Sequence, residues 1–263
     1  MALEFIVFAV ILHRIFVRRN KLEASLHLSE LLLKEKSVGI ELLNEKLRVV
    51  GGLTRNDFYS KFSTVTGYAH LLKEEYADQT DIVEGLSKME QAVKETMKIF
   101  DFDKMYEQIG VEEPTYIDAE EQLKEAAALF SGFTPTIMNE CHGLTVLADS
   151  FLKQLFYNFI DNTRKFGKKT TTIKVYYERA DQGRLKFIYE DDGVGVPVEN
   201  KPSLFEGNFN AGLGLFLTKK MMDVYGWTIN EEGEPDKGAK FVITIPKVNQ
   251  DGKENYRIAI LGE

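Results

Sequence analysis

The amino-acid sequence predicts an α+β fold in which a helical hairpin precedes an α/β-sandwich domain. Residues 21–50 contain no proline and carry apolar residues at helical spacing, which predicts a long helix. Two further amphipathic runs follow before Pro114. After Pro114 helical and alternating patterns are mixed, as expected where helices cover one face of a sheet.

The composition limits the kinds of function. The chain has 263 residues, 44% of them apolar, which is enough for one or two cores. Its net charge of −8 argues against a nucleic-acid binder, which would need a basic face. Cys141 is the only cysteine, so no internal disulfide can form, and with its neighbour His142 it offers too few ligands for a metal site. We expect a buried thiol and a loop histidine.

Residues 1–20 form a short apolar segment whose role can be interpreted in two ways. Positions 2–17 are apolar apart from Glu4, His13 and Arg14, and a membrane-spanning helix needs about twenty such residues. The basic cluster that follows is typical of the cytoplasmic flank of a membrane helix and comprises Arg14, Arg18, Arg19 and Lys21. The segment is either a shortened membrane anchor of a cytoplasmic protein or the exposed start of a helix.

Residues 21–50 predict a coiled-coil helix. Apolar residues recur at loosely heptad intervals with Glu and Lys between them, which favours a parallel two-helix coil. These apolar positions are Leu22, Leu26, Leu33, Ile40, Leu43, Leu47 and Val50. The Gly51-Gly52 pair weakens a helix without necessarily ending it.

Residues 51–112 predict a hairpin of two helices. The first helix stops near Tyr76, Asp78 or Thr80 can cap the second, and the second reaches about Gln108. Their apolar stripes are Leu53, Phe58, Phe62, Val65, Ala69 and Leu72, and then Ile82, Leu86, Met89, Val93, Met97 and Phe100. One hairpin cannot bury both its faces, whereas two copies can form a four-helix bundle. We therefore expect a dimer; the rival is a hairpin that packs on its own C-terminal domain.

Residues 113–247 predict the sandwich domain, and residues 248–263 a polar tail. The expected helices cover residues 120–130, 151–166 and 213–225. The expected strands cover residues 144–147, 171–178, 185–190 and 240–245, with a turn at 181–183. Residues 256–261 can add an edge strand.

Three runs in this domain carry groups that suit a nucleotide. Asn158 and Asn162 stand four apart on a predicted helix, and amide oxygens can complete the shell of a Mg²⁺ that bridges phosphates. Asp191 precedes glycines at 193 and 195, so a carboxylate can hydrogen-bond a base edge while the backbone closes around it. Residues 212–215 read Gly-Leu-Gly-Leu and open a helix, whose free N–H groups suit phosphate. Each run alone is common; together they predict an ATP site.

This ordered set resembles the cytoplasmic core of sensor histidine kinases, a dimerisation and phosphotransfer hairpin followed by an ATP-binding catalytic domain. The resemblance covers residues 50–246 and implies ATP and Mg²⁺ as cofactors and a response-regulator receiver domain as a partner. It assigns Asn162 to Mg²⁺, Asp191 to the adenine amino group and Lys165 to phosphate. The positions that it matches to nucleotide binding are Asn158, Asn162, Lys165, Phe166, Asp191, Gly193, Gly195, Gly212, Leu213 and Gly214. It also matches Leu204-Phe205-Glu206 to the start of that family's mobile lid, and Gly238 with Phe241 to a structural element of the sheet.

The hairpin departs from that family at Asn56, which stands where the phosphoacceptor histidine is expected. Asn56 falls opposite Phe58 and Val65 around the helix, so it should face solvent. The resemblance makes Asp57 the acid-base neighbour, and Ser60 shares the face of Asn56 one turn on. An amide cannot replace the acceptor, because its nitrogen lone pair is delocalised into the carbonyl, whereas neutral imidazole has a nucleophilic nitrogen.

Two further features accompany this departure. His70 lies on a similar face about four turns away and without an acidic neighbour, and we interpret it as a surface histidine. Only residues 207–211 separate the start of the expected lid from Gly212, and no Lys or Arg lies between Pro202 and Thr218. The lid is therefore short and offers no cation to a γ-phosphate.

The sequence favours a degenerate histidine kinase that binds Mg·ATP, dimerises, and is impaired in self-phosphorylation. One alternative is an active histidine kinase feeding a response regulator, either with a native histidine at position 56 or by phosphorylating a partner hairpin in a heterodimer. A scaffold that has lost nucleotide binding is another. ATP hydrolysis of the gyrase or chaperone type is disfavoured, because those relatives place a glutamate base where this chain has Asn158.

Overall fold

The computed structural model describes residues 2–207 and 213–259, with side chains described from residue 13 onward. The chain forms two compact units, residues 1–100 and residues 101–263. The first unit is helical, and the second contains both sheets and the nucleotide-site motifs.

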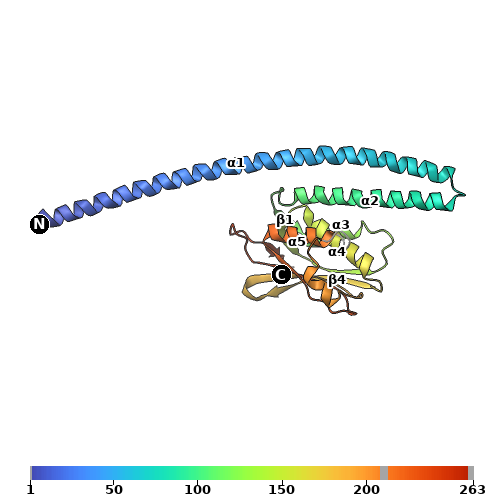
Figure 1. The fold of residues 1–263 in the computed structure, drawn as a ribbon. Coiled ribbons are helices and arrows are strands. Elements are labelled where there is room, and N and C mark those ends of the chain that lie inside the picture. Colours follow the sequence, from blue (N-terminus) through green and yellow to red (C-terminus); the bar gives the residue numbers. More distant parts are fainter. Residues whose placement is uncertain (1, 208–212, 260–263) are drawn as a thin grey trace. The chain divides into compact units, whose positions relative to one another are not determined.

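The predicted helical hairpin is present, and most of it lies in the first unit. Helix α1 (Ala2–Glu75) continues through Gly51 and Gly52, and a short turn joins it to α2 (Thr80–Gln108), which runs back along it (Figure 1). The two helices contact each other through the predicted stripes. Phe58 stacks on Phe100 with 5.0 Å between ring centroids, Phe62 contacts the same ring, and Lys73 pairs with Glu90 at 3.0 Å.

The apolar residues predicted for a coiled coil lie on an unpaired part of α1. All described side chains from residue 13 to residue 50 are exposed, including Leu22, Leu26, Leu43 and Leu47. The parallel coil and the dimer stay predictions, because one chain cannot show either. Within the described residues, no helix has an apolar stretch sufficient to cross a bilayer.

The second unit is built on a five-stranded mixed sheet in the order β2-β4-β5-β7-β6. Its strands are β2 (Thr136–Glu140), β4 (Thr172–Ala180), β5 (Arg184–Asp191), β6 (Thr228–Glu231) and β7 (Lys240–Ile245). Strand β2 pairs parallel with β4, and the other pairs are antiparallel. The central strand β5 ends at Asp191, opposite Ile173 of β4, which places this carboxylate at one end of the sheet.

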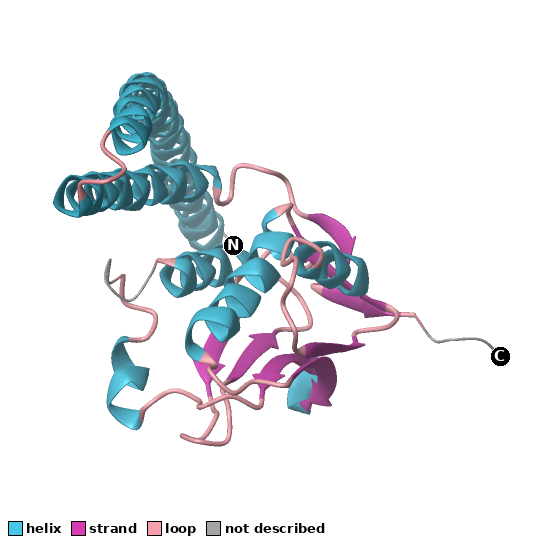
Figure 2. Ribbon diagram, turned by 90° about the vertical axis from the view of Figure 1, so that its right-hand side faces the viewer, coloured by secondary structure: helices cyan, strands magenta, loops and turns pink. Residues whose placement is uncertain are grey.

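Three helices cover one face of this sheet: α3 (Ala119–Ala127), α4 (Phe151–Phe166) and α5 (Gly214–Tyr225) (Figures 1 and 2). The apolar face of α4 supplies the centre of the core, with Leu155, Phe156 and Phe159 fully buried. Tyr225 at the end of α5 donates a hydrogen bond to the buried Asp149 just before α4, and burial followed by this bond raises the pKa of Tyr225. These contacts fix α5 relative to α4.

A second sheet has three antiparallel strands in the order β1-β3-β8: β1 (Thr115–Asp118), β3 (Leu144–Ala148) and β8 (Tyr256–Ile258). Strand β8 confirms part of the edge strand expected at 256–261; residues 260 and 261 lie outside the described residues. The tail therefore folds back on the domain, and the backbone N–H of Leu147 donates to the Asn255 carbonyl at 2.7 Å.

Most predicted elements agree with the structure, and the misses share a cause. The helix at 151–166 and the strand at 240–245 have the predicted bounds. Strands β1, β2 and β6 were not predicted, and they have only four, five and four residues. Such short strands at the edges of sheets carry too little alternation to separate them from loops. Two 3₁₀ helices, η1 (Asp181–Gly183) and η2 (Val198–Ser203), complete the fold.

Candidate functional site

A cavity of about 740 Å³ lies in the second unit at the carboxyl end of β5. The end of α4, the start of β7, η2 and the first turn of α5 complete its walls. Its described lining comprises Asn162, Thr163, Phe166, Gly167, Asp191, Gly195, Val196, Pro197, Asn200, Ser203, Leu204, Glu206, Gly207, Leu215, Ala239 and Phe241. Asp191 and Asn162, which come from two separate sequence motifs, thus face one common cavity.

Asp191 is buried and held in a single orientation by the protein. Its Oδ1 accepts hydrogen bonds from the backbone N–H of Gly193 at 2.9 Å and of Ala239 at 3.1 Å. Its Oδ2 accepts from the Thr163 hydroxyl at 2.7 Å. A carboxylate oxygen has more than one acceptor position, so Oδ2 can still accept a hydrogen bond from a ligand. Thr163 was not predicted as a site residue, and the only hint in the sequence was its position next to Asn162.

Asn162 lines the cavity, and one of its polar atoms is buried with no partner among the described residues. Its Nδ2 is buried and makes no hydrogen bond within the described part of the chain. A buried amide in this state costs stability unless a ligand or water satisfies it. The Oδ1 atom of the same side chain is a hard oxygen of the type that Mg²⁺ prefers. The residue therefore fits the metal contact expected of it.

Asn158 is placed differently, although its spacing in the sequence suggested a similar role. Its Nδ2 donates to the carbonyl of Gly214 at 3.0 Å and to the Thr218 hydroxyl at 3.3 Å, and its Oδ1 accepts from Gln154 at 2.9 Å. Asn158 is not part of the cavity lining. In this structure it joins α4 to the start of α5, the helix whose Leu215 lines the cavity.

Lys165 and Phe166 end α4 with different surroundings. Phe166 lines the cavity. The Lys165 ammonium instead forms an ion pair with Asp161, whose other oxygen accepts from Arg164 at 2.6 Å. Lys165 is not among the lining residues. The phosphate contact expected of this lysine would require it to leave Asp161.

The glycines around Asp191 are required by contacts within the protein. A Cβ on Gly193 would lie 2.6 Å from the Thr170 hydroxyl, and a Cβ on Gly195 would lie 2.7 Å from the Glu234 carbonyl. At Gly238 (φ +124°) it would lie 1.7 Å from the carbonyl oxygen of Asp191. This approach brings the N–H of Ala239 onto Asp191, so Gly238 helps to orient the carboxylate. Gly195 lines the cavity and Gly193 does not.

The second glycine run lies partly outside the described residues, which exclude Gly212. Leu213 precedes α5 with no capping hydrogen bond from its side chain, and Gly214 is the first helical residue. The first N–H groups of a helix have no partner within it, so an uncapped start can bind an anion. Leu215, in the same turn, lines the cavity.

Residues 200–207, the described part of the segment before this helix, contribute one wall of the cavity. Phe205 meets Phe241 edge-on with 6.5 Å between ring centroids. Lys201 of η2 pairs at 2.6 Å with the buried Oε2 of Glu231 on β6 and also donates to the Gly233 carbonyl. This ion pair anchors the start of the expected lid to the sheet.

The hairpin residues singled out in the sequence lie in the first unit. Asn56 and Ser60 are exposed on α1, as expected. Asp57 is exposed as well, and its carboxylate forms an ion pair with Lys61. The expectation that His70 lacks an acidic neighbour is wrong, because the Glu74 carboxylate lies 3.5 Å from its Nε2. Glu74 is not adjacent to His70 in the sequence, but it stands four residues later and therefore lies on the same face of the helix.

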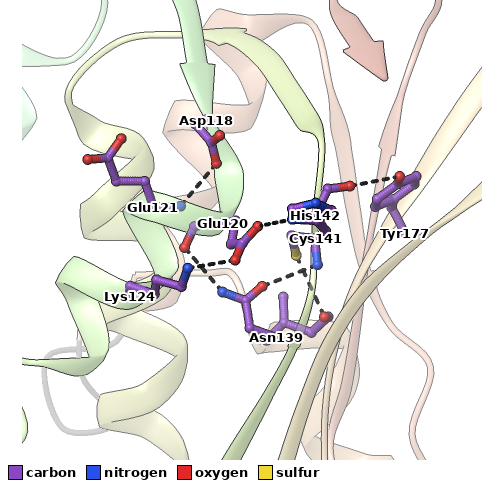
Figure 3. A network of polar contacts seen from close by, with 9 residues as sticks. Asp118, Glu120, Glu121, Lys124, Asn139, Cys141, His142 and Tyr177 are labelled. Carbon is purple, nitrogen blue, oxygen red and sulfur yellow. Dashed lines mark hydrogen bonds and ion pairs between the residues drawn. The ribbon is translucent and has the colours of Figure 1, made fainter. Parts of the chain in front are cut away.

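A polar cluster around His142 in the second unit confirms the expected buried thiol and loop histidine (Figure 3). Glu120 contacts His142 Nδ1 at 2.7 Å and Lys124 at 2.6 Å. Cys141 is buried, and its burial, followed by nearby carboxylates, raises the pKa of its thiol to about 12. Among the described residues no group of three or more His, Cys, Asp or Glu side chains could hold a metal ion.

Comparison with known proteins gives the type of this domain. Residues 148–249 match the family described as histidine kinase-, DNA gyrase B- and HSP90-like ATPase. Phytochrome-like protein Cph1 of Synechocystis sp. is 25% identical over 243 residues, covering 79% of this chain and 30% of that protein. Sensor protein KdpD of Clostridium acetobutylicum is 31% identical over 111 residues, or 37% of this chain and 12% of KdpD.

A solved structure extends the likeness to the helical region. Full-length ShkA in complex with AMPPNP superposes with a TM-score of 0.57 at 21% identity, over 80% of this chain and 46% of ShkA. The chain thus spans less than half of each of these three proteins. It consists of a helical N-terminal region followed by an α/β domain of the histidine kinase ATPase type.

Proposed function

We propose that this chain is a signal-transduction protein of the histidine kinase type that binds Mg·ATP and does not phosphorylate itself. One observation carries the proposal: Asp191 and Asn162 line one cavity of the domain, while Asn56 occupies the expected acceptor position on α1. The protein then transmits its nucleotide state by conformation or by acting on partners.

The cavity suits an adenine nucleotide for reasons of hydrogen bonding and polarity. The exocyclic amino group of adenine can donate to Asp191 Oδ2, which Thr163 holds in place. Leu204, Leu215 and Phe241 supply apolar walls for the purine. The uncapped start of α5 can receive phosphate oxygens. Asn162 is the residue that would hold Mg²⁺, and the ion would supply positive charge to the phosphates.

The loss of self-phosphorylation follows from the chemistry of the acceptor. Phosphoryl transfer depends mainly on positioning and charge stabilisation, but it still needs a nucleophile with an available lone pair. The Asn56 amide has none. His70 is exposed on the same helix with Glu74 beside it, and it is the residue to exclude first when labelling is tested.

The proposed function gives each part of the chain a role. Residues 21–50 form a coiled-coil signalling helix, residues 51–112 the dimerisation hairpin and residues 113–247 the catalytic domain, with residues 1–20 before them and residues 248–263 after them.

Partners and location follow from the same assignment. The exposed apolar residues of α1 support pairing with a second chain, as a homodimer or a heterodimer. A response-regulator receiver domain is the expected partner. The expected location is cytoplasmic, with residues 2–17 as a candidate membrane tether.

Phospholabelling tests the proposal directly. The full chain, incubated with Mg²⁺ and ATP labelled at the γ-phosphate, should stay unlabelled when the reaction is quenched in alkali and separated by gel electrophoresis. An active histidine kinase of known competence serves as the positive control. Acid-labile label on any residue of this chain, His70 included, would contradict the proposal.

The alternative is a kinase that acts on another chain, and the presence of Asp191 and Asn162 in one cavity favours it over a scaffold that has lost nucleotide binding. In that case the catalytic domain phosphorylates a histidine on the hairpin of a heterodimer partner. Mixing this chain and labelled ATP with a catalytically inactive histidine kinase that keeps its acceptor would separate the two functions. Label on the added protein supports the alternative.

A further inference from the structure

The described lining of the cavity carries negative charge and no positive charge. Among the described residues that line it, Asp191 and Glu206 are carboxylates, and none is Lys, Arg or His. Glu206 is exposed next to Gly207, which approaches the Phe216 ring near the start of α5. This carboxylate therefore lies on the side of the cavity where the uncapped helix start invites phosphate.

The described basic residues on the surrounding elements lie outside the cavity lining, and most of them have partners elsewhere. On α4, Lys165 and Arg164 both pair with Asp161. After α4, Lys169 donates to the Asp236 carbonyl at 3.2 Å, and Lys168 is exposed outside the cavity lining. The remaining basic side chains of η2 and α5 are Lys201, paired with Glu231, Lys219, paired with Asp223 at 2.5 Å, and Lys220, whose Nζ lies 5.2 Å from the centre of the Phe216 ring.

The segment after Glu206 cannot supply the missing charge. The sequence from residue 203 to residue 217 contains no Lys, Arg or His. The backbone N–H groups of α5 and a bound Mg²⁺ can serve two phosphates as well as three. The third phosphate adds negative charge beside Glu206 and gains no ammonium or guanidinium partner for it.

We propose, building on the proposed nucleotide-binding function, that this cavity binds adenosine diphosphate about as tightly as adenosine triphosphate. The two nucleotides then compete directly, and the nucleotide bound at the site follows their ratio. A protein that does not transfer the γ-phosphate can use this ratio as an input. The adenine contact to Asp191 and the helix-start contacts set the affinity for both nucleotides.

Isothermal titration of the full chain with each nucleotide, at the same free Mg²⁺ concentration, tests the inference. The two dissociation constants should agree within about threefold, whereas a γ-phosphate held by a protein cation would give about tenfold or more in favour of ATP. A preference for ATP of that size would overturn the inference and leave the proposed function intact. If neither nucleotide binds, the proposed function fails and the inference fails with it.

Two variants examine the charges separately. Lys165→Met should leave the ratio of the two dissociation constants unchanged, because Lys165 pairs with Asp161; a selective loss of ATP affinity would show that the lysine reaches the γ-phosphate and would overturn the inference. Glu206→Gln should shift the ratio about threefold toward ATP by removing a repulsive charge. Glu199→Gln makes the same charge change on η2 outside the cavity lining and should leave the ratio unchanged. An equal response in both glutamate variants would contradict the role given to Glu206.

Discussion

Asp191→Asn should weaken ATP binding by at least about 100-fold and lower the free energy of unfolding by only about 1–2 kcal/mol. The two backbone N–H groups of Gly193 and Ala239 fix an acceptor at Oδ1. The amide oxygen will therefore take that position and leave its NH₂ group in place of Oδ2. Thr163 can accept from this NH₂ group, but the amino group of adenine cannot. Calorimetric titration with ATP and urea unfolding measure the two effects.

The same reasoning predicts a change in base preference. Inosine triphosphate carries a carbonyl where ATP carries the amino group, so it should bind the native protein poorly and the Asp191→Asn variant better than ATP does. Asp192→Asn is the matched control, since the Asp192 carboxylate accepts from the backbone N–H of Thr171 at 2.7 Å and is outside the cavity lining. ATP affinity of Asp191→Asn within threefold of the native value would sink the assignment of Asp191.

Asn56→His should convert the chain from unlabelled to labelled, with a signal at least about tenfold above the native background. The substitution adds a neutral imidazole at an exposed position of α1, with the nucleophilic nitrogen that an amide lacks. The label should be acid-labile and stable to alkali, as expected for phosphohistidine. Autoradiography after incubation with γ-labelled ATP measures it.

Three companion variants identify the source and the destination of the label. Asn56→Gln keeps an amide and should stay unlabelled. Asn56→His combined with Asp191→Asn should lose the label, because the phosphoryl group comes from the nucleotide in the cavity. Asn56→His combined with His70→Ala should keep it. If the label survives the Asp191 substitution, the phosphoryl group on the hairpin does not come from a nucleotide bound in this cavity.

The sequence identified the elements that a local pattern determines. The α4 helix was predicted with its observed bounds because its apolar face repeats over sixteen residues. Asp191 and Asn162 were found because both stand in short motifs and both line the cavity. The hairpin was likewise visible, since Phe58, Phe62 and Phe100 stand on the predicted stripes and contact one another.

What could not be predicted depends on residues distant in the chain. Asn158 and Asn162 look equivalent in the sequence, and only the packing of α5 against α4 turns Asn158 toward Gly214 and Thr218. The need for glycine at 238 comes from the carbonyl of Asp191, far back in the chain. Lys165 could not be assigned to Asp161 rather than to phosphate, because both partners suit an ammonium group and one lies a single turn away.

The most direct test is a calorimetric titration of the full chain with ATP, with and without Mg²⁺. We expect one saturable site per chain at micromolar concentration, bound more weakly when the metal is chelated. Absence of saturable binding at millimolar ATP would mean that the carboxylate and the amide facing this cavity serve some other ligand or none.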